Sequence, residues 1–236
     1  MGESNMQENE IKKRAGIAVI MIWAVMALDI IMLVSDGFEA NLLQQIADGA
    51  GVNEAEAEAN DTRQATIGLI YTVVFIGSVV TFLRWFSAAY KGLHSRVQGL
   101  RFTEGWAVGA WFVPFLNLFR PYQIMKELYV ETDKMLQDHE EYQREPLNVS
   151  SVGLWWGLWV VVGIVSQASM RIALRSEEAD MLVMSSYLSI LSGIISVPLA
   201  LVAVKVIKGY ARAENLLGPV ESAGDELPDN NEPASQ

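Results

Sequence analysis

Apolar residues gather along this chain into four long runs that contain almost no charge. The runs cover residues 15–35, 65–83, 152–170 and 182–204. Each has about the ~20 residues that an α-helix needs to cross a hydrocarbon core ~30 Å thick at ~1.5 Å per residue. The pattern predicts an all-α, polytopic membrane protein with four transmembrane helices.

The segments outside these runs leave no room for a second folded domain. The chain has 236 residues, and 51% of them are hydrophobic. We expect a membrane domain over residues 15–212, preceded by a short cytoplasmic tail over 1–14. The segment 213–236 carries three prolines and six acidic residues without a basic one, a composition that predicts a disordered cytoplasmic tail.

The basic residues predict the orientation, because Lys and Arg concentrate in short cytoplasmic loops. With the N-terminus inside, fourteen of the 17 Lys and Arg lie on the cytoplasmic side, and only Arg63, Arg171 and Arg175 lie outside. We therefore expect a multi-pass protein of the cell (inner or plasma) membrane with both termini in the cytoplasm. The lipid bilayer is its first expected partner.

A connector over residues 106–145 separates the second and third runs. Its first part, 106–119, is apolar but has 14 residues, a length more typical of interfacial or re-entrant segments than of a span. We place it in or on the inner leaflet, returning to the side from which it came. From Pro121, which suits the first turn of a helix, apolar residues recur at helical spacing with charged residues opposite, which predicts an amphipathic cytoplasmic helix. Over 121–145 three basic residues stand against seven acidic ones, so we expect this helix to pack on the bundle or on a partner rather than on anionic lipid.

Composition excludes several kinds of chemistry. The chain has no cysteine, which rules out disulfides, thiolate metal sites and cysteine nucleophiles. Its two histidines, His94 and His139, lie outside the four runs, so they cannot hold a haem between them inside the bundle. We find no nucleophile–base or metal-ligand pattern, and therefore predict no catalytic, cofactor-binding or metal site and no enzymatic activity. Nucleic acid is not an expected partner, because the basic residues are scattered among acidic ones.

Asp29 is the carboxylate placed well inside a predicted span, and an intramembrane ionisable residue is a functional candidate by default. Counting from Ser35 at ~1.5 Å per residue puts it roughly 9 Å below the outer boundary. At the same depth the other spans hold Tyr71 or Thr72, Gln167, and Ser189 or Ser192, and we expect Tyr71, Gln167 and Ser192 to join Asp29. The sequence thus predicts a polar layer, which is either a proton- or cation-binding site or, as we favour, a hydrogen-bonded group that fixes helix packing.

The fourth run carries small and weakly polar residues along one helical face: Ser185, Ser189, Ser192, Ser196, Ala200 and Ala203. Such a face either lines a solute path or allows close helix packing, and we favour packing. Gly153 and Gly157 in the third run form a G-x-x-x-G step suited to receive it. Trp155, Trp156 and Trp159 stand at the cytoplasmic start of the third run, where an aromatic belt at headgroup level is the favoured interpretation.

Three stretches give the chain a resemblance to a known family. Arg84–Lys91 reads RWFSAAYK, Gly105–Tyr122 reads GWAVGAWFVPFLNLFRPY, and Leu154–Trp159 reads LWWGLW. These segments resemble the bacterial integral-membrane family known as domain of unknown function 4328, over roughly residues 65–212. Similar sequences often place Asn where this chain has Gly92, so that position is given no role. The resemblance implies a four-helix membrane domain and brings no established activity.

The motif of the connector admits two arrangements. Its marked residues are Trp106, Pro114, Asn117, Arg120, Pro121 and Tyr122. If the segment dips into the bundle, Asn117 and the carbonyls freed at Pro114 resemble the broken helices of transporters. If it lies flat, the aromatic side chains hold the interface and Arg120 reaches lipid phosphate. We favour the flat arrangement, because transporters of that type are usually larger and repeated.

Two functional hypotheses remain from the sequence. The first is a non-enzymatic scaffold, accessory or regulatory membrane protein with a membrane-protein partner or a homo-oligomeric state. The second is a small oligomeric channel or transporter for a small solute or cation that uses Asp29, Asn117 and the serine face of the fourth helix. A serine face open to water favours the second, and one buried against the third helix favours the first.

Overall fold

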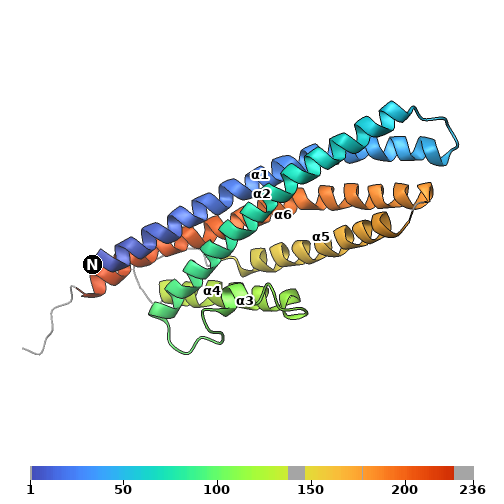
Figure 1. Ribbon diagram of the computed structural model, residues 1–236. Helices are drawn as coiled ribbons and strands as arrows, with labels where there is room; N and C mark the ends of the chain where they lie inside the picture. The colour runs from blue at the N-terminus through green and yellow to red at the C-terminus, as the bar shows by residue number, and fades with distance from the viewer. Residues whose placement is uncertain (1, 138–146, 177, 226–236) are drawn as a thin grey trace, which may run out of the picture.

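The computed structural model describes residues 2–137, 147–176 and 178–225, and these residues form helices joined by short loops (Figure 1). In chain order the helices are α1 (Gly2–Ala47), α2 (Glu54–Arg96), α3 (Trp106–Gly109), the 3-10 turn η1 (Leu116–Leu118), α4 (Arg120–Gln137), α5 (Val149–Arg175) and α6 (Ala179–Asp225). Among the described residues, four helices are long and apolar enough to cross a membrane, namely α1, α2, α5 and α6. The predicted fold class is confirmed, and the chain is a multi-pass membrane protein by helix length and hydropathy.

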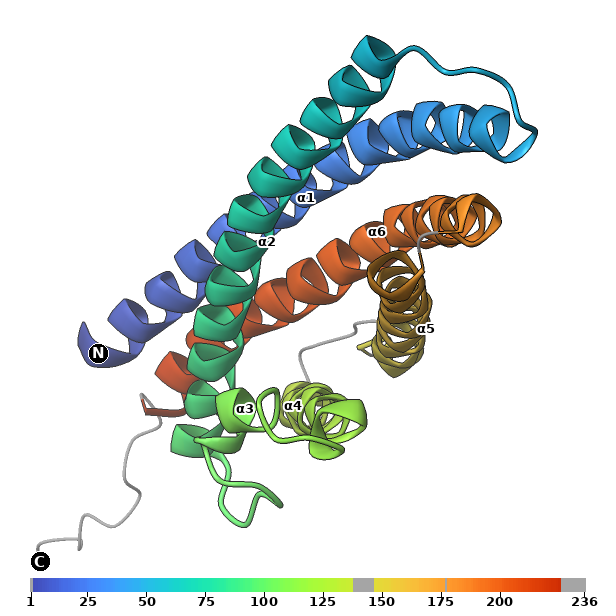
Figure 2. The same cartoon turned by 45° about the vertical axis from the view of Figure 1, so that its right-hand side comes forward.

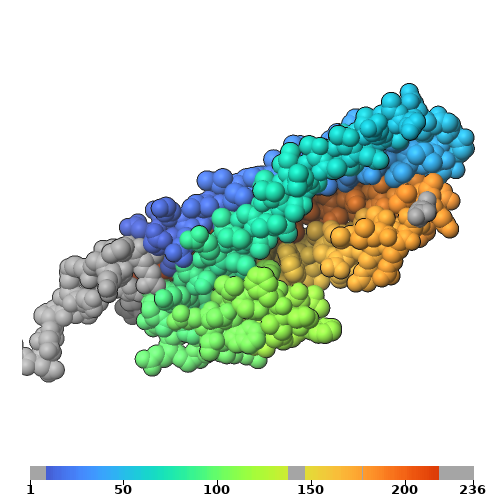
Figure 3. All heavy atoms as spheres, in the orientation of Figure 1, coloured from blue at the N-terminus to red at the C-terminus, as the bar shows by residue number. Residues whose placement is uncertain are grey.

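The four long helices lie in the order α2, α1, α6, α5 (Figure 2). α1 packs antiparallel to α6 in the middle, α2 returns along α1, and α5 lies along α6. We call the end with the loop between α1 and α2 the hairpin end, and the end with the N-terminus and α4 the terminal end. Toward the hairpin end α2 and α5 diverge, and α6 is visible in the hollow between them (Figure 3). The connector crosses from α2 to α5 near the terminal end, where α4 contacts α2, α5 and α6.

Three of these helices are much longer than the predicted spans. α1 has 46 residues, α2 has 43 and α6 has 47, against the ~20 that a bilayer requires. Asn53 begins α2 by accepting a hydrogen bond from the amide of Ala55 at 3.0 Å, and Asn148 begins α5 in the same way with Ser151 at 3.1 Å. The helices therefore project beyond the hydrocarbon region at their ends.

The expected disorder from residue 213 onward is wrong for the part that the structure describes. α6 continues to Asp225, because Ala213 and Leu217 continue its buried face against the terminal-end core. The rest of the predicted tail, 226–236, lies outside the described residues, as do positions 138–146 of the connector.

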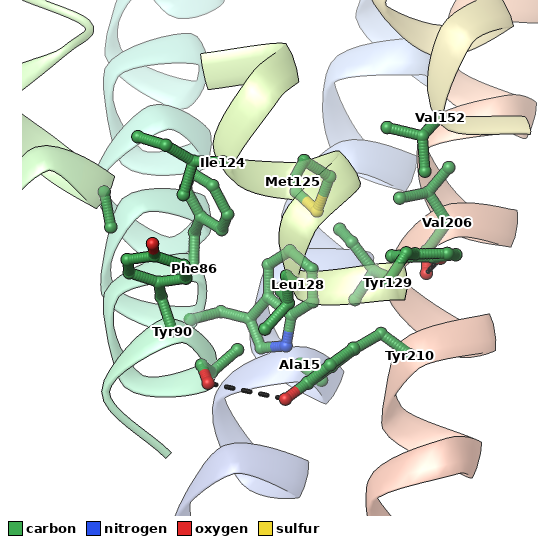
Figure 4. Close-up of a cluster of buried hydrophobic side chains, with 14 of the residues drawn as sticks. Ala15, Phe86, Tyr90, Ile124, Met125, Leu128, Tyr129, Val152, Val206 and Tyr210 are labelled. Atoms are coloured by element: carbon green, nitrogen blue, oxygen red, sulfur yellow. Dashed lines mark hydrogen bonds between the residues drawn. The ribbon is translucent and has the colours of Figure 1, made fainter. Parts of the chain in front are cut away.

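The large core of the molecule lies at the terminal end and not at the level of the spans. There α4 inserts one face between α2, α5 and α6 (Figure 4). Its buried stripe is the predicted one and contains Ile124, Met125, Leu128, Tyr129, Thr132 and Leu136. Along the spans many apolar side chains are exposed instead, among them Leu69, Val73 and Ile164. Exposed apolar surface of this extent on long apolar helices is what contact with lipid requires.

Candidate functional site

The structure brings Asp29 and Tyr71 together between α1 and α2. Asp29 is buried, and its carboxylate has the Tyr71 hydroxyl as its side-chain hydrogen-bonding partner. Both residues come from the antiparallel α1–α2 pair, where they lie at equal depth and on the faces of the two helices that meet. The pair satisfies a polar group that would be costly alone in hydrocarbon.

The other two residues of the predicted polar layer lie elsewhere. Ser192 on α6 is buried against α5, where its Oγ lies 2.6 Å from the Oγ of Ser166. Gln167 is exposed on the surface of α5. The structure thus divides the predicted layer into an α1–α2 pair, an α5–α6 pair and one exposed amide.

Three serines of the α6 face contact α5, and of these Ser185 and Ser192 are buried and Ser189 is half-buried. The Oγ of Ser169 donates to the carbonyl of Ser185 at 2.8 Å and lies 2.8 Å from the Oγ of Ser189. Together with the Ser166–Ser192 contact, these bonds form a serine ladder (Ser166, Ser169, Ser185, Ser189 and Ser192) that joins the two helices through the apolar region. Hydroxyl pairs of this kind strengthen helix packing where water is excluded.

The prediction that Gly153 and Gly157 of α5 receive the serine face of α6 is wrong. A Cβ on Gly153 would meet the Tyr122 hydroxyl of α4 at 4.0 Å, and Gly157 has nothing within 4 Å. The G-x-x-x-G step therefore does not receive α6. Ser166 and Ser169 do so, because they lie on the face of α5 that looks toward α6.

The apolar connector turns back without crossing the long helices. α3 ends at Gly109, and the chain reverses at Phe115, whose φ of 65° and ψ of −41° are rare for a side chain of this size. The amide of Leu116 donates to the carbonyl of Pro114 at 2.8 Å, so Pro114–Leu116 form a γ-turn. The prediction that the segment returns to the side from which it came is confirmed by this geometry.

A tryptophan cluster holds the connector against α5. Trp111 lies 5.5 Å from Trp159 and 5.7 Å from Trp156, measured between ring centroids. Trp156 also donates its Nε1–H to the carbonyl of Leu118 at 2.9 Å, which pairs one of the carbonyls freed by the broken helix. Trp155 and Trp156 are buried and pack against the connector, so the interpretation of these two residues as part of an aromatic belt is wrong.

Arg120 is held by aromatic rings rather than by an acid. Its guanidinium carbon lies 4.7 Å from the ring centroid of Phe102 and 5.4 Å from that of Trp106. Within the described part of the chain Arg120 makes no hydrogen bond or ion pair, and its Nε is buried without an acceptor. Pro121, which is buried, follows it in the first turn of α4 as predicted.

The remaining residues of the motif have packing positions. Tyr122 is half-buried and faces Gly153 of α5. Asn117 is half-buried, and its backbone amide donates to Val113 at 3.1 Å within the connector. Asn117 thus belongs to the connector, whereas Asp29 and Tyr71 form their pair between α1 and α2.

Sequence reasoning missed a polar network at the hairpin end. Arg63 of α2 donates to Ser35 of α1 at 3.0 Å and to Asn60 at 2.5 Å. Gln64 donates to the carboxylates of Glu39 at 2.6 Å and Asp36 at 3.4 Å. The sequence did contain a signal for this network. Arg63 stands directly before the second apolar run, and the acidic residues Asp36 and Glu39 follow the first run, so an antiparallel helix pair brings them to the same end. This network fixes the register of α1 and α2 outside the apolar region.

A second network closes the terminal end. Tyr90 of α2 donates to Glu127 of α4 at 2.7 Å, and the other oxygen of Glu127 accepts from the amide of Arg101 at 2.7 Å. Tyr129 donates to the carbonyl of Val206 at 2.5 Å, and its burial raises the pKa of its phenol above the ordinary value. These bonds fix α4 between the helices that it contacts.

Comparison with known proteins adds a family and no activity. No curated protein and no solved structure matches the chain. One family model, described as a domain of unknown function, matches residues 48–212, which contain α2 to α5, the connector and most of α6. The resemblance seen in RWFSAAYK, GWAVGAWFVPFLNLFRPY and LWWGLW is thereby confirmed, and the chain belongs to the DUF4328 family.

Proposed function

We propose that this protein is a non-enzymatic scaffold, accessory or regulatory subunit of the cell membrane, with its terminal end in the cytoplasm. The orientation rests on charge: Lys12, Lys13, Arg14 and the Lys205–Arg212 group belong to the terminal end, where cytoplasmic Lys and Arg are expected. The role rests on packing, as argued next.

The observation that carries the proposal is the burial of the serine face. A solute path needs hydroxyls that water can reach, but the hydroxyls of Ser169 and Ser192 are buried and bonded across the α5–α6 contact. The hydroxyl of the buried Ser185 donates to the carbonyl of Leu182 in its own helix. These bonds hold α5 and α6 in a fixed arrangement, as we expect of a protein that acts by positioning a partner.

The terminal end supplies a surface for a protein partner. Because the apolar stripe of α4 is used inside the molecule, its outward face is polar and displays Lys126, Lys134 and Gln137. The buried core beneath it makes this face rigid, which lowers the entropy lost on binding. A partner would meet α4 through charge and hydrogen bonds rather than through an apolar groove.

Co-purification in nanodiscs tests the proposal. We expect a stoichiometric protein partner that is lost when Lys126→Glu and Lys134→Glu reverse the charges of the outward face of α4. The matched control is Glu58→Lys, an equally exposed charge near the hairpin end, which should keep the partner. A partner-free homo-oligomer that carries an ion flux in vesicles, abolished by Asp29→Asn, would support the channel or transporter instead.

The proposed orientation has its own test, which the cysteine-free sequence makes clean. Gln98→Cys at the terminal end should react with a membrane-impermeant maleimide only after cells are opened. Ala50→Cys, in the loop at the hairpin end, should react in intact cells. The reverse pattern would overturn the orientation.

A further inference from the structure

Arg120 has the surroundings of an anion-binding residue. Its Nε is buried without an acceptor, while its two terminal nitrogens are not buried and also have no partner within the described residues. A guanidinium carries five N–H donors in a planar fork that matches a phosphate. The rings of Phe102 and Trp106 hold that fork in place, so little side-chain entropy would be lost when an anion binds.

The position of Arg120 along the chain adds a second source of positive potential. Arg120 and Pro121 begin α4, a helix of 18 residues, and the first amides of a helix present a partial positive charge. An anion beside the guanidinium would therefore also face the N-terminus of α4. Neither the guanidinium nor the helix N-terminus alone selects a ligand, but both favour an anion at the same place.

Contacts of the neighbouring residues place this point at the level of lipid headgroups. Leu118, two residues earlier, accepts from Trp156, which lies four residues inside the predicted span, or ~6 Å below its boundary at ~1.5 Å per residue. On the other side, the carbonyl oxygen of Phe102 lies 3.0 Å from the hydroxyl oxygen of Tyr90. Tyr90 lies seven residues beyond the second span, or ~10 Å outside it. The guanidinium contacts the ring of Phe102 and lies two residues from Leu118, so we assign it to the interval between these levels. The headgroup region on each side of the ~30 Å core is ~5–8 Å thick.

The tip of the connector beside Arg120 is apolar and uncovered. Phe112 is 71% exposed and Phe115 is 81% exposed, and Val113, Leu118 and Phe119 are exposed with them. The tip lies beside α5 at the level of Trp156, so it continues the lipid-contacting surface of a membrane span. Acyl chains are the apolar material available at that depth.

We propose that the connector binds one phospholipid of the leaflet at the terminal end, with Arg120 on its phosphate and Phe112 and Phe115 among its acyl chains. The phosphate chemistry alone would also admit free inorganic phosphate. The apolar tip next to the guanidinium selects the lipid, because free phosphate would leave that tip without a partner. The inference does not depend on the proposed function, since it holds for whichever leaflet the terminal end faces.

A test without any substitution uses the purified protein in a non-ionic detergent. Dihexanoyl phosphatidylglycerol, added below its micelle concentration, should raise the thermal unfolding midpoint, because it binds the folded state. Sodium phosphate at the same concentration should not. An equal rise with phosphate would show a free-anion site, and no rise with either would show no site, and each result would overturn the proposal.

Substitution then assigns the effect to Arg120. We expect Arg120→Gln to weaken the apparent lipid affinity about tenfold or more, as the loss of a charge-assisted hydrogen bond predicts. Arg101→Gln is the matched control: this guanidinium lies 5.5 Å from the same Phe102 ring but is exposed, and its loss should leave lipid binding unchanged. Unchanged binding in a folded Arg120→Gln protein would contradict the assignment.

Spin labels test the depth of the tip even where Arg120→Gln fails to fold. A nitroxide on Phe115→Cys should be accessible to oxygen and shielded from a water-soluble nickel chelate, like one on Val73→Cys in the span. A label on Gln98→Cys in the loop after α2 should show the opposite pattern. A Phe115 label that behaves like the Gln98 label would place the tip in water and overturn the lipid assignment.

Discussion

Arg96 of α2 and Glu214 of α6, 118 positions apart in the chain, form an ion pair with 2.6 Å between Nη1 and Oε1. The Glu214 side chain is 1% exposed, and its second oxygen accepts from Tyr210 at 2.9 Å. The pair joins α2 to α6 at the terminal end, beyond the apolar part of both helices. It therefore lies within the core that holds α4 and the connector.

Arg96→Met should destabilise the protein strongly, because it leaves a buried carboxylate without its counter-charge. Breaking a buried pair in this way costs about 3–5 kcal/mol of unfolding free energy. The double variant Arg96→Met with Glu214→Met should recover much of that loss. Unfolding in SDS titrations measures both.

The control for this experiment is the exposed pair of Arg14 and Glu10, 3.2 Å apart, on α1. Arg14→Met should cost at most about 1 kcal/mol, since exposed pairs contribute little. Equal losses for Arg14→Met and Arg96→Met would contradict the role assigned to burial.

The contrast between Ser192 and Gln167 shows what the sequence could and could not predict. Hydropathy gave the four spans, since a bilayer requires about the same apolar length of every helix. Counting residues gave depth, and Asp29 and Tyr71 do lie at the same level of the α1–α2 pair. Depth does not tell which way a side chain points around the helix axis, because that direction turns by about 100° from one residue to the next. Gln167 and its neighbour Ser166 share a level, but only Ser166 faces α6.

The ends of helices and the connector were harder to predict for a different reason. Residues 213–225 carry three acidic residues and no basic one and belong to a segment with the composition of a disordered tail, but Ala213, Glu214 and Leu217 lie in the core or pair with a distant helix. Trp155 and Trp156 look like a membrane belt until Trp111 is brought beside them. Both features depend on contacts between segments far apart in the chain, which no local pattern contains.

Ser169→Ala should weaken the α5–α6 contact. The hydroxyl makes two contacts at 2.8 Å, to Ser185 and Ser189, and polar contacts between membrane helices are worth about 0.6 kcal/mol, up to about 1.7. We expect a loss in this range from SDS unfolding. Ser150→Ala, at an exposed position of α5, is the control and should have no measurable effect. A loss no larger than that of the control would show that the serine ladder contributes nothing to stability.

Gly209→Ala should disturb the bond between Tyr129 and Val206. A Cβ at position 209 would lie 3.3 Å from the Tyr129 hydroxyl, which is committed to the Val206 carbonyl. The hydroxyl must yield by a few tenths of an ångström, so we expect a loss of about 1 kcal/mol, as for one weakened hydrogen bond. In a Tyr129→Phe background the same change should cost less, because the hydroxyl is gone, and a thermal-melting cycle of the four proteins measures the difference. Equal costs in both backgrounds would exclude this explanation.

Phe115→Gly separates backbone strain from contact with lipid. Phe115 is the non-glycine residue with positive φ among the described residues, and such conformations cost about 1–3 kcal/mol. Glycine adopts this region freely, so in detergent we expect the unfolding midpoint to rise or stay level. In nanodiscs the same variant should lose stability relative to the wild type, because an 81% exposed ring no longer enters the acyl region. Equal behaviour in the two environments would indicate that the ring has no lipid partner.

Asp29→Asn tests whether the α1–α2 pair is structural. Asparagine keeps the shape and an oxygen that accepts from Tyr71, so a packing role predicts an unfolding midpoint close to that of the wild type. Asp29→Leu removes the acceptor and leaves the hydroxyl of the half-buried Tyr71 without it, which should cost about 1 kcal/mol. Ion flux into vesicles should be the same for wild type, Asp29→Asn and empty liposomes under the scaffold proposal. A flux that only the wild type supports would assign the carboxylate to transport, since the two side chains differ in their ability to ionise and hardly in shape.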